Sequence, residues 1–134
     1  AFQKFKVPGK PQYALVSSLD PITANRRDLK SFIDPKDAAR NVVNDSKTMT
    51  LGALADLPSH AILDRGRIIG LWEFDVNSGS IVWMTFGLRD KPLESAVKKT
   101  EGFVRDQLGD ARSFSLDSPK SRAPRVAALR KAGK

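Results

Sequence analysis

The chain of 134 residues lacks cysteine and has a single histidine, His60. Without cysteine it has no disulfides, thiolate zinc sites, iron–sulfur clusters or thiol nucleophile. One imidazole also excludes a multi-histidine metal centre and leaves His60 as the only possible imidazole base. Its wholly apolar runs are a few residues long, too short to span a bilayer. We therefore expect one domain (1–134) with a core of its own and with no metal or cofactor.

The first ten residues, AFQKFKVPGK, lack the apolar segment of a secretory signal peptide. This predicts a cytoplasmic protein, associated with the nucleoid if it binds DNA. The chain begins with alanine instead of methionine, so we expect a fragment or a processed product of a longer protein. Its oligomeric state stays open.

Positive charge is concentrated at the two ends of the chain. There are 23 lysines and arginines against 15 aspartates and glutamates, a formal net charge of +8. The basic ends, 1–11 and 119–134, contain nine of the basic residues and no acid, which leaves 14 basic and 15 acidic residues between them. Clustered lysine and arginine favour a polyanionic partner such as nucleic acid, because they release condensed counterions. Basic ends that only keep a small domain soluble remain the alternative.

The centre of the chain predicts an antiparallel meander. Apolar-rich stretches at 60–64, 67–74 and 80–86 are separated by turn signals at Arg65-Gly66 and at 77–79. Apolar residues at helical spacing then predict a long amphipathic helix at about 91–108, with Gly109 as its C-terminal glycine.

The segments on either side of this centre have a less regular spacing of apolar residues. We expect a strand at 12–17, a helix at 21–32 and a short second helix that includes Val42 and Val43. For 44–58 two readings stay open, a strand at 48–51 or a helical turn at 51–57. We expect a final strand at 112–116 and a short C-terminal helix at 122–131. The fold class is thus α+β, with a mostly antiparallel sheet or a partly open barrel.

Enzyme signatures are missing from this sequence. It has no Gly-x-Ser-x-Gly elbow, no phosphate-binding P-loop and no Gly-x-Gly-x-x-Gly. Asp20 and Asp34 each precede a proline, which suits helix capping better than catalysis. His60, just before a predicted strand, is typical of a hydrogen-bonded strand-edge residue.

Basic pairs remain as candidate binding residues. Two arginines lie on the first predicted helix, and two more flank the Gly66 turn, where they can grip phosphate or simply be solvated. Trp72 and Trp83 fall on adjacent strands and are expected in the core. In the last helix an apolar side with Val126 and Leu129 can dock while the arginines face outward. The candidate nucleic-acid-binding residues are Arg26, Arg27, Arg65, Arg67, Lys120, Arg122 and Arg125.

The predicted hairpin carries a resemblance to a known family. Residues 62–72 (ILDRGRIIGLW) resemble the "(V/L)-D-G-R-(V/I)-(V/I)-G-x-W" hairpin of a winged-helix DNA-binding family that includes the AlkZ-like (YcaQ-like) DNA glycosylases. Leu19-Asp20-Pro21 with Arg26-Arg27-Asp28 is similar to that family's "L-P-x-x-D-P-…-R-D-R" segment. The helix around 103–109 suits the helix that closes those proteins. The resemblance covers about residues 12–110.

The resemblance implies the C-terminal, β-rich domain of a longer protein whose tandem winged-helix modules precede it. The family's glycosylases remove alkylated or crosslinked bases with a Gln-x-Gln or Gln-x-Asp motif in the N-terminal part. None of Gln3, Gln12 and Gln107 precedes a glutamine or an aspartate by two positions, so no catalytic residue is carried over. Whether the chain is an enzyme stays open on this basis. The implied partners are double-stranded DNA and the winged-helix domains of the same protein.

Three functional hypotheses follow. The first is a DNA-binding or scaffolding module with backbone contacts and no catalytic motif of its own. The second is a structural or protein-interaction domain that packs on the rest of a longer chain and has no direct nucleic-acid role. The third is a hydrolase that uses Asp20, Asp28 or His60.

Overall fold

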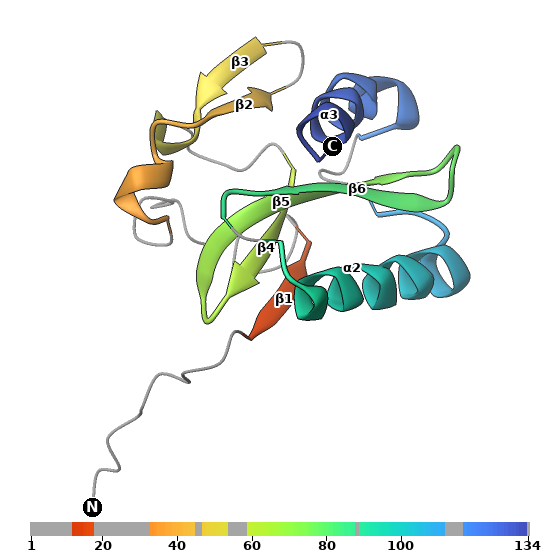
Figure 1. Ribbon diagram of the computed structural model, residues 1–134. Helices are drawn as coiled ribbons and strands as arrows, with labels where there is room; N and C mark the ends of the chain where they lie inside the picture. The colour runs from red at the N-terminus through yellow and green to blue at the C-terminus, as the bar shows by residue number, and fades with distance from the viewer. Residues whose placement is uncertain are drawn as a thin grey trace, which may run out of the picture.

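The computed structural model describes residues 12–17, 33–44, 47–53, 59–87, 89–111 and 117–133 as an α+β fold (Figure 1). Its centre is an antiparallel sheet in the strand order β1-β4-β5-β6, which is open and does not close into a barrel. The strands are β1 (Tyr13–Val16), β4 (His60–Asp64), β5 (Arg67–Asp75) and β6 (Ser80–Thr85). The predicted meander and first strand are therefore confirmed.

Helices cover both faces of this sheet (Figure 1). On one face lies α2 (Lys91–Phe103), which continues into the π-helical turn η4 (Val104–Leu108). On the other lies α3 (Pro119–Ala132). None of the helices among the described ranges is long and apolar enough to cross a membrane.

Local sequence signals explain where the helices begin and end. The Asp90 carboxylate accepts the backbone N–H of Leu93 at the start of α2, and Gly109 ends η4 with a left-handed φ of 77°. Ser118 and Ser121 form a capping box at the start of α3, so this helix begins three residues before the predicted position 122. The predicted long helix at 91–108 is confirmed, with its last turn wound as a π-helix.

A β-bulge in β5 decides which side chains face which helix. Ile62 pairs with Gly70 and Leu63 with Ile68, so Ile69 is the extra residue. A Cβ at Gly70 would overlap the carbonyl oxygen of Met84, so only glycine fits there. Past the bulge, Trp72 belongs to the core cluster on the α2 face.

The segment before β4 differs from the prediction. A 3-10 turn, η2 (Pro35–Asp37), is followed by a small antiparallel hairpin of β2 (Asn41–Asn44) and β3 (Lys47–Thr50), and then by η3 (Leu51–Ala53). The predicted second helix is wrong, because Asp34 caps only one turn and the β-branched Val42 is paired on a strand opposite Met49. Both open readings of 44–58 hold in part, as a strand to Thr50 and a helical turn after it.

Two predicted elements lie outside the described residues, namely the helix at 21–32 and the strand at 112–116. The core consists of one apolar cluster on each face of the sheet. Trp72 and Trp83 are opposite each other on β5 and β6 and are both buried, as predicted.

Candidate functional site

The most concentrated polar feature of the molecule is a buried group of charges between α3 and the sheet. We call it the ion cluster; it consists of Glu73, Asp110, Asp117, Arg122 and Arg125. Glu73 is the β5 residue that faces α3, and both arginines come from the inward side of α3. Each arginine is only 1% exposed.

Hydrogen bonds satisfy the guanidinium groups of the ion cluster. Arg125 donates from Nε to Glu73 Oε1 at 2.7 Å and from Nη2 to Asp117 Oδ1 at 2.8 Å. Arg122 donates from Nε to Asp117 Oδ2 at 3.1 Å and from Nη1 to Asp110 Oδ1 at 2.7 Å. Burial acts to lower the pKa of both arginines, but the carboxylates outweigh it and raise the pKa of each.

This arrangement corrects the expected orientation of Arg122 and Arg125. The sequence analysis placed both at the surface as nucleic-acid-binding residues, with the apolar side of the last helix docked. In the fold the arginines face the sheet together with Leu129, because Glu73 and Asp117 supply buried carboxylates for them. Their charges are thus paired with carboxylates, and only 1% of each arginine is exposed to solvent. The ion cluster attaches α3 to β5.

The only histidine lies beside the ion cluster. His60 begins β4, is fully buried, and has its ring centroid 4.3 Å from that of Trp72. Its Nε2 lies 3.1 Å from the carbonyl oxygen of Ala111. The predicted hydrogen-bonded strand residue is therefore confirmed, although β4 is an inner strand of the sheet and not an edge.

The turn between β4 and β5 holds the two predicted hairpin arginines. Arg65 has φ 50° and Gly66 has φ 84°, the pair of positive φ values that defines a type I′ hairpin turn. Arg65 bonds to both carboxylate oxygens of Asp64 at 3.2 Å. Arg67 is 65% exposed at its side chain, and its Nη1 lies 4.0 Å from Asp34. Both guanidinium groups thus project at the hairpin tip, as expected.

Arginines and lysines differ across the described part of the chain. Every arginine there lies within 4.0 Å of a carboxylate oxygen. Several exposed lysines, in contrast, have no carboxylate partner among the described residues. They are Lys91, Lys98 and Lys99 on α2 and Lys120 and Lys131 on α3. The surplus positive charge of the described residues therefore sits on lysines, not on the arginines that the sequence analysis emphasised.

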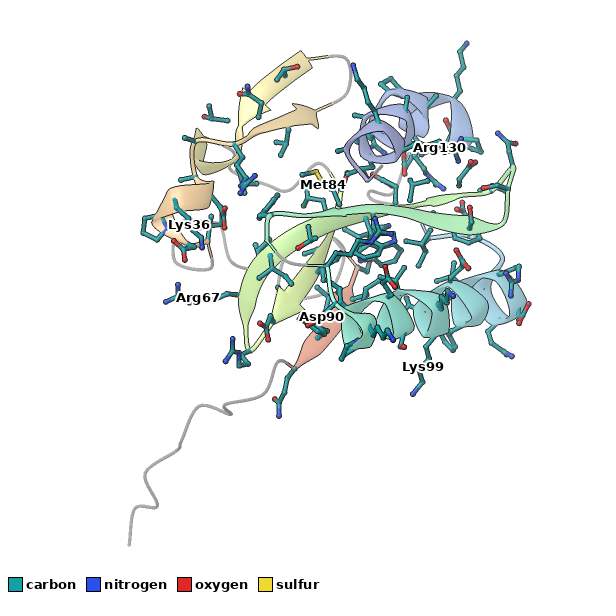
Figure 2. All side chains as sticks on the ribbon, in the orientation of Figure 1. Lys36, Arg67, Met84, Asp90, Lys99 and Arg130 are labelled. Atoms are coloured by element: carbon teal, nitrogen blue, oxygen red, sulfur yellow. The ribbon has the colours of Figure 1, made fainter. Side chains whose placement is uncertain are left out.

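The hairpin tip and the start of α2 lie at the same end of the molecule. Tyr13, paired opposite Asp64 on the neighbouring strand, donates its hydroxyl hydrogen to Asp90 Oδ2 at 2.7 Å. Burial and the hydrogen bond to Asp90 raise the pKa of Tyr13 to about 12, so the phenol keeps its proton at neutral pH. Figure 2 shows Arg67 directed outward from this end and Lys99 directed away from the sheet.

We group the exposed basic side chains of the hairpin tip and of α2 under the name basic face; they are Arg65, Arg67, Lys91, Lys98 and Lys99. Lys91 and Lys98 are seven residues apart, so they share one side of α2. The sequence predicted no binding role for these three lysines. The signal that could have found them is weak, because α2 holds three lysines against two glutamates.

The remaining predicted site residues are not brought to the basic face. Arg26 and Arg27 lie outside the described residues. Lys120 is in the first turn of α3, and the neighbouring Pro119 lines a cavity of about 220 Å³ with Asp75. Asp75 is the last residue of β5 and Arg67 the first, which separates them by about 26 Å along the strand. Lys120 and the hairpin tip thus belong to opposite ends of the sheet.

Two further findings concern metal ions and relatives. Among the described residues no group of three or more His, Asp and Glu side chains is arranged to hold a metal ion. No protein-family model, no curated protein and no solved structure matches the chain. The family resemblance therefore stays a prediction from the hairpin motif.

Proposed function

We propose that this chain binds the phosphate backbone of double-stranded DNA through the basic face, without reading base sequence. The observation that carries the proposal is the distribution of uncompensated charge. Each described arginine lies within 4.0 Å of a carboxylate oxygen, with Arg67 the most exposed of them, whereas Lys91, Lys98 and Lys99 are exposed and have no acidic partner among the described residues. Such lysines are free to replace the counterions of a polyanion.

The conformation of the hairpin tip supports the same surface. Type I′ turns favour asparagine or glycine at the first central position, because a longer side chain at positive φ is strained. Arg65 occupies that position with φ 50°, at a cost of about 1 kcal/mol. A strained residue at an exposed tip suggests that its side chain matters more than turn stability. Beside it, Arg67 offers the most exposed guanidinium of the ion pairs given above.

The spacing along α2 fits a duplex backbone. Seven residues of α-helix advance about 10 Å, so Lys91 and Lys98 are separated by about the axial rise of three base pairs. Contacts of this kind position a protein on DNA but carry no sequence information. The proposed role is thus a backbone-binding module, in line with the expected DNA-binding part of an AlkZ-like repair protein.

The test compares two variants with the same change in charge. Lys98→Gln/Lys99→Gln removes two charges from the basic face, and Lys120→Gln/Lys131→Gln removes two from α3. Affinity for a duplex of mixed sequence is measured over a series of salt concentrations by fluorescence anisotropy. We expect the first variant to weaken binding and to reduce the slope of log affinity against log salt by about 1.8, since each phosphate contact contributes about 0.9. The α3 variant should keep nearly the wild-type slope.

Equal slopes for the two variants, or a change confined to the α3 variant, would contradict the basic face as the site. Absence of binding at low salt in the wild type would contradict DNA binding by this chain. In that case a separate observation favours the alternative of a protein-interaction domain. Val76, Phe103 and Leu108 are the exposed large apolar side chains of the described residues, and they lie in or near the β5–β6 turn and the end of α2.

A further inference from the structure

An open cavity of about 220 Å³ lies beside α3, at the end of the sheet opposite the hairpin tip. One wall is the end of β5 and the turn that follows it, residues 74–77. The other wall is one side of α3 between residues 119 and 130, where the lining side chains recur at helical spacing. We call this cavity the α3 groove. It follows α3 for about 17 Å, which is three turns of the helix.

The side chains that line the α3 groove are largely apolar or small. Val76 is 40% exposed, and Val126 is half-buried. Ala123 and Ala127 are exposed and four residues apart, so they lie one above the other on the surface of α3. Because the distance between packed helices depends on the side chains at their contact, two alanines at this spacing let a second helix approach α3 closely.

The rim of the α3 groove is positively charged. Lys120 is three residues from Ala123 and Lys131 is four residues from Ala127, so each lysine neighbours an alanine of the groove. Both lysines are exposed and have no carboxylate partner among the described residues. Asp75, the carboxylate in the opposite wall, already accepts a hydrogen bond of 2.6 Å from Arg130. The charge left for a partner is therefore positive.

We propose that the α3 groove binds an acidic amphipathic helix of a partner protein. The apolar side chains of such a helix pack on Val76, Val126 and the two alanines, and its carboxylates pair with the lysines of the rim. A nucleic-acid backbone would satisfy the lysines but leave the apolar side chains uncovered. Neither α2, with three lysines against two glutamates, nor α3, which has no acid, is such a helix, so a second copy of this chain fits less well.

The α3 groove is separate from the basic face, so this proposal does not depend on DNA binding. The experiment measures binding of three labelled synthetic peptides to the full chain by fluorescence anisotropy. The peptides are three repeats of Glu-Glu-Leu-Leu, of Lys-Lys-Leu-Leu and of Glu-Glu-Ser-Ser. We expect only the first to bind, because it alone combines acidic charge with an apolar side.

Variants in charge then locate the site on α3. Lys120→Gln/Lys131→Gln should weaken binding of the Glu-Glu-Leu-Leu peptide about fivefold, because it removes two exposed charge pairs. Lys98→Gln/Lys99→Gln removes the same charge from α2 and should bind the peptide as the wild type does. Equal weakening by the two double variants would overturn the proposal.

A bulkier change tests the groove itself. Ala123→Glu places a carboxylate between the rim and the floor, and it should weaken binding of the Glu-Glu-Leu-Leu peptide by more than about tenfold. Ser95→Glu, which adds the same charge at an exposed position of α2, is the matched control and should leave binding unchanged. If Ala123→Glu instead weakens binding of duplex DNA and not of the peptide, the groove holds nucleic acid and the proposal is wrong.

The wild type gives a result that needs no variant. In NMR titration with the Glu-Glu-Leu-Leu peptide, the largest shifts of backbone amide signals should fall at residues 75–77 and 119–130. Shifts concentrated on α2 would overturn the assignment to the α3 groove. Failure of this peptide to bind, or equal binding of the Glu-Glu-Ser-Ser peptide, would overturn the proposal as a whole.

Discussion

The two long helices lie on opposite faces of one sheet and are held there by different chemistry. The buried side chains of α2 are Leu93 and Val97, which pack among aromatic residues of the sheet. The buried side chains of α3 are Leu129 and the arginines Arg122 and Arg125. Apolar burial thus holds α2, whereas two of the three buried residues of α3 are ion-paired arginines.

This difference determines how each helix responds to change. Apolar contacts tolerate repacking, and the loss of stability grows with the cavity that a deletion leaves, so damage to the α2 face should scale with the volume removed. The ion cluster is stable only as a complete set, because a buried charge without its partner keeps its desolvation penalty and loses its compensation. The stability of the α3 face should therefore change little when exposed residues of α3 are substituted. It should fall sharply when any single charged side chain of the ion cluster is removed.

The largest effect is expected from Arg125→Met. The methionine fills most of the space, but it leaves Glu73 with only the more distant Arg122 (Nε–Oε2 3.9 Å) and one side of Asp117 without its cation, so we expect a loss of about 3–5 kcal/mol in the free energy of unfolding. Urea denaturation followed by tryptophan fluorescence measures it. Lys131→Met on the exposed side of α3 is the control and should change stability by less than about 0.5 kcal/mol. Similar values for the two variants would show that the ion cluster does not stabilise α3.

On the α2 face, Leu93→Ala should lower the free energy of unfolding by about 3 kcal/mol, because removal of a fully buried leucine side chain leaves a cavity against the sheet. The difference from wild type should be the same at pH 7.5 and at pH 5.5, since the neighbours of Leu93 in its cluster are apolar. The same denaturation series at both pH values checks this. A loss of stability that grows at pH 5.5 would link the α2 face to the ion cluster. It would contradict the difference between the two helices.

The next test concerns Gly70, beside the bulge in β5. Gly70→Ala places a Cβ against the backbone of β6, and we expect a loss of about 2 kcal/mol. Gly87→Ala is the matched control, because a Cβ at Gly87 meets nothing within 4 Å. Thermal unfolding of the two variants checks the prediction. Equal melting temperatures would mean that β5 and β6 do not approach as closely as described.

The smallest effect concerns the exposed ion pair at the edge of the α3 face. Burial acts to raise the pKa of Asp75, but hydrogen bonds from Arg130, Ser78 and Asn77 outweigh it and lower the pKa. The carboxylate therefore stabilises the fold above about pH 4, and this contribution is lost as the pH falls further. Asp75→Asn should lower the free energy of unfolding by about 0.5 kcal/mol at pH 7 and leave it nearly unchanged at pH 3. Denaturation at the two pH values measures this. A constant cost would exclude the ionised carboxylate as its source.

Much of the scaffold was predictable from local signals. Alternating apolar residues and glycine turns gave the meander, and apolar periodicity with Gly109 at its C-terminal end gave α2. These signals suffice because each belongs to a short stretch of chain. The β2–β3 hairpin was missed because Val42 follows a capped turn and resembles a helix continuation, whereas its strand pairing depends on Met49 further along the chain.

The sites were less predictable because they depend on long-range pairing. Arg122 and Arg125 look like a surface polyanion contact in sequence, and their burial follows from Glu73, some fifty residues earlier. Of the basic face, only the two hairpin arginines were predicted from the sequence. The hairpin arginines followed from the turn at Gly66, but the α2 lysines stand out only when each arginine of the described residues has been assigned its carboxylate.

The most direct test of the difference between the helices is a double-mutant cycle between Glu73 and Arg125. Glu73→Leu, Arg125→Met and the double variant are compared with wild type by urea denaturation at pH 7.5. If buried ion pairing holds α3, the double variant should be much more stable than the sum of the single losses implies, with a coupling energy of at least about 2 kcal/mol. Losses that add, with a coupling energy below about 0.5 kcal/mol, would contradict the account.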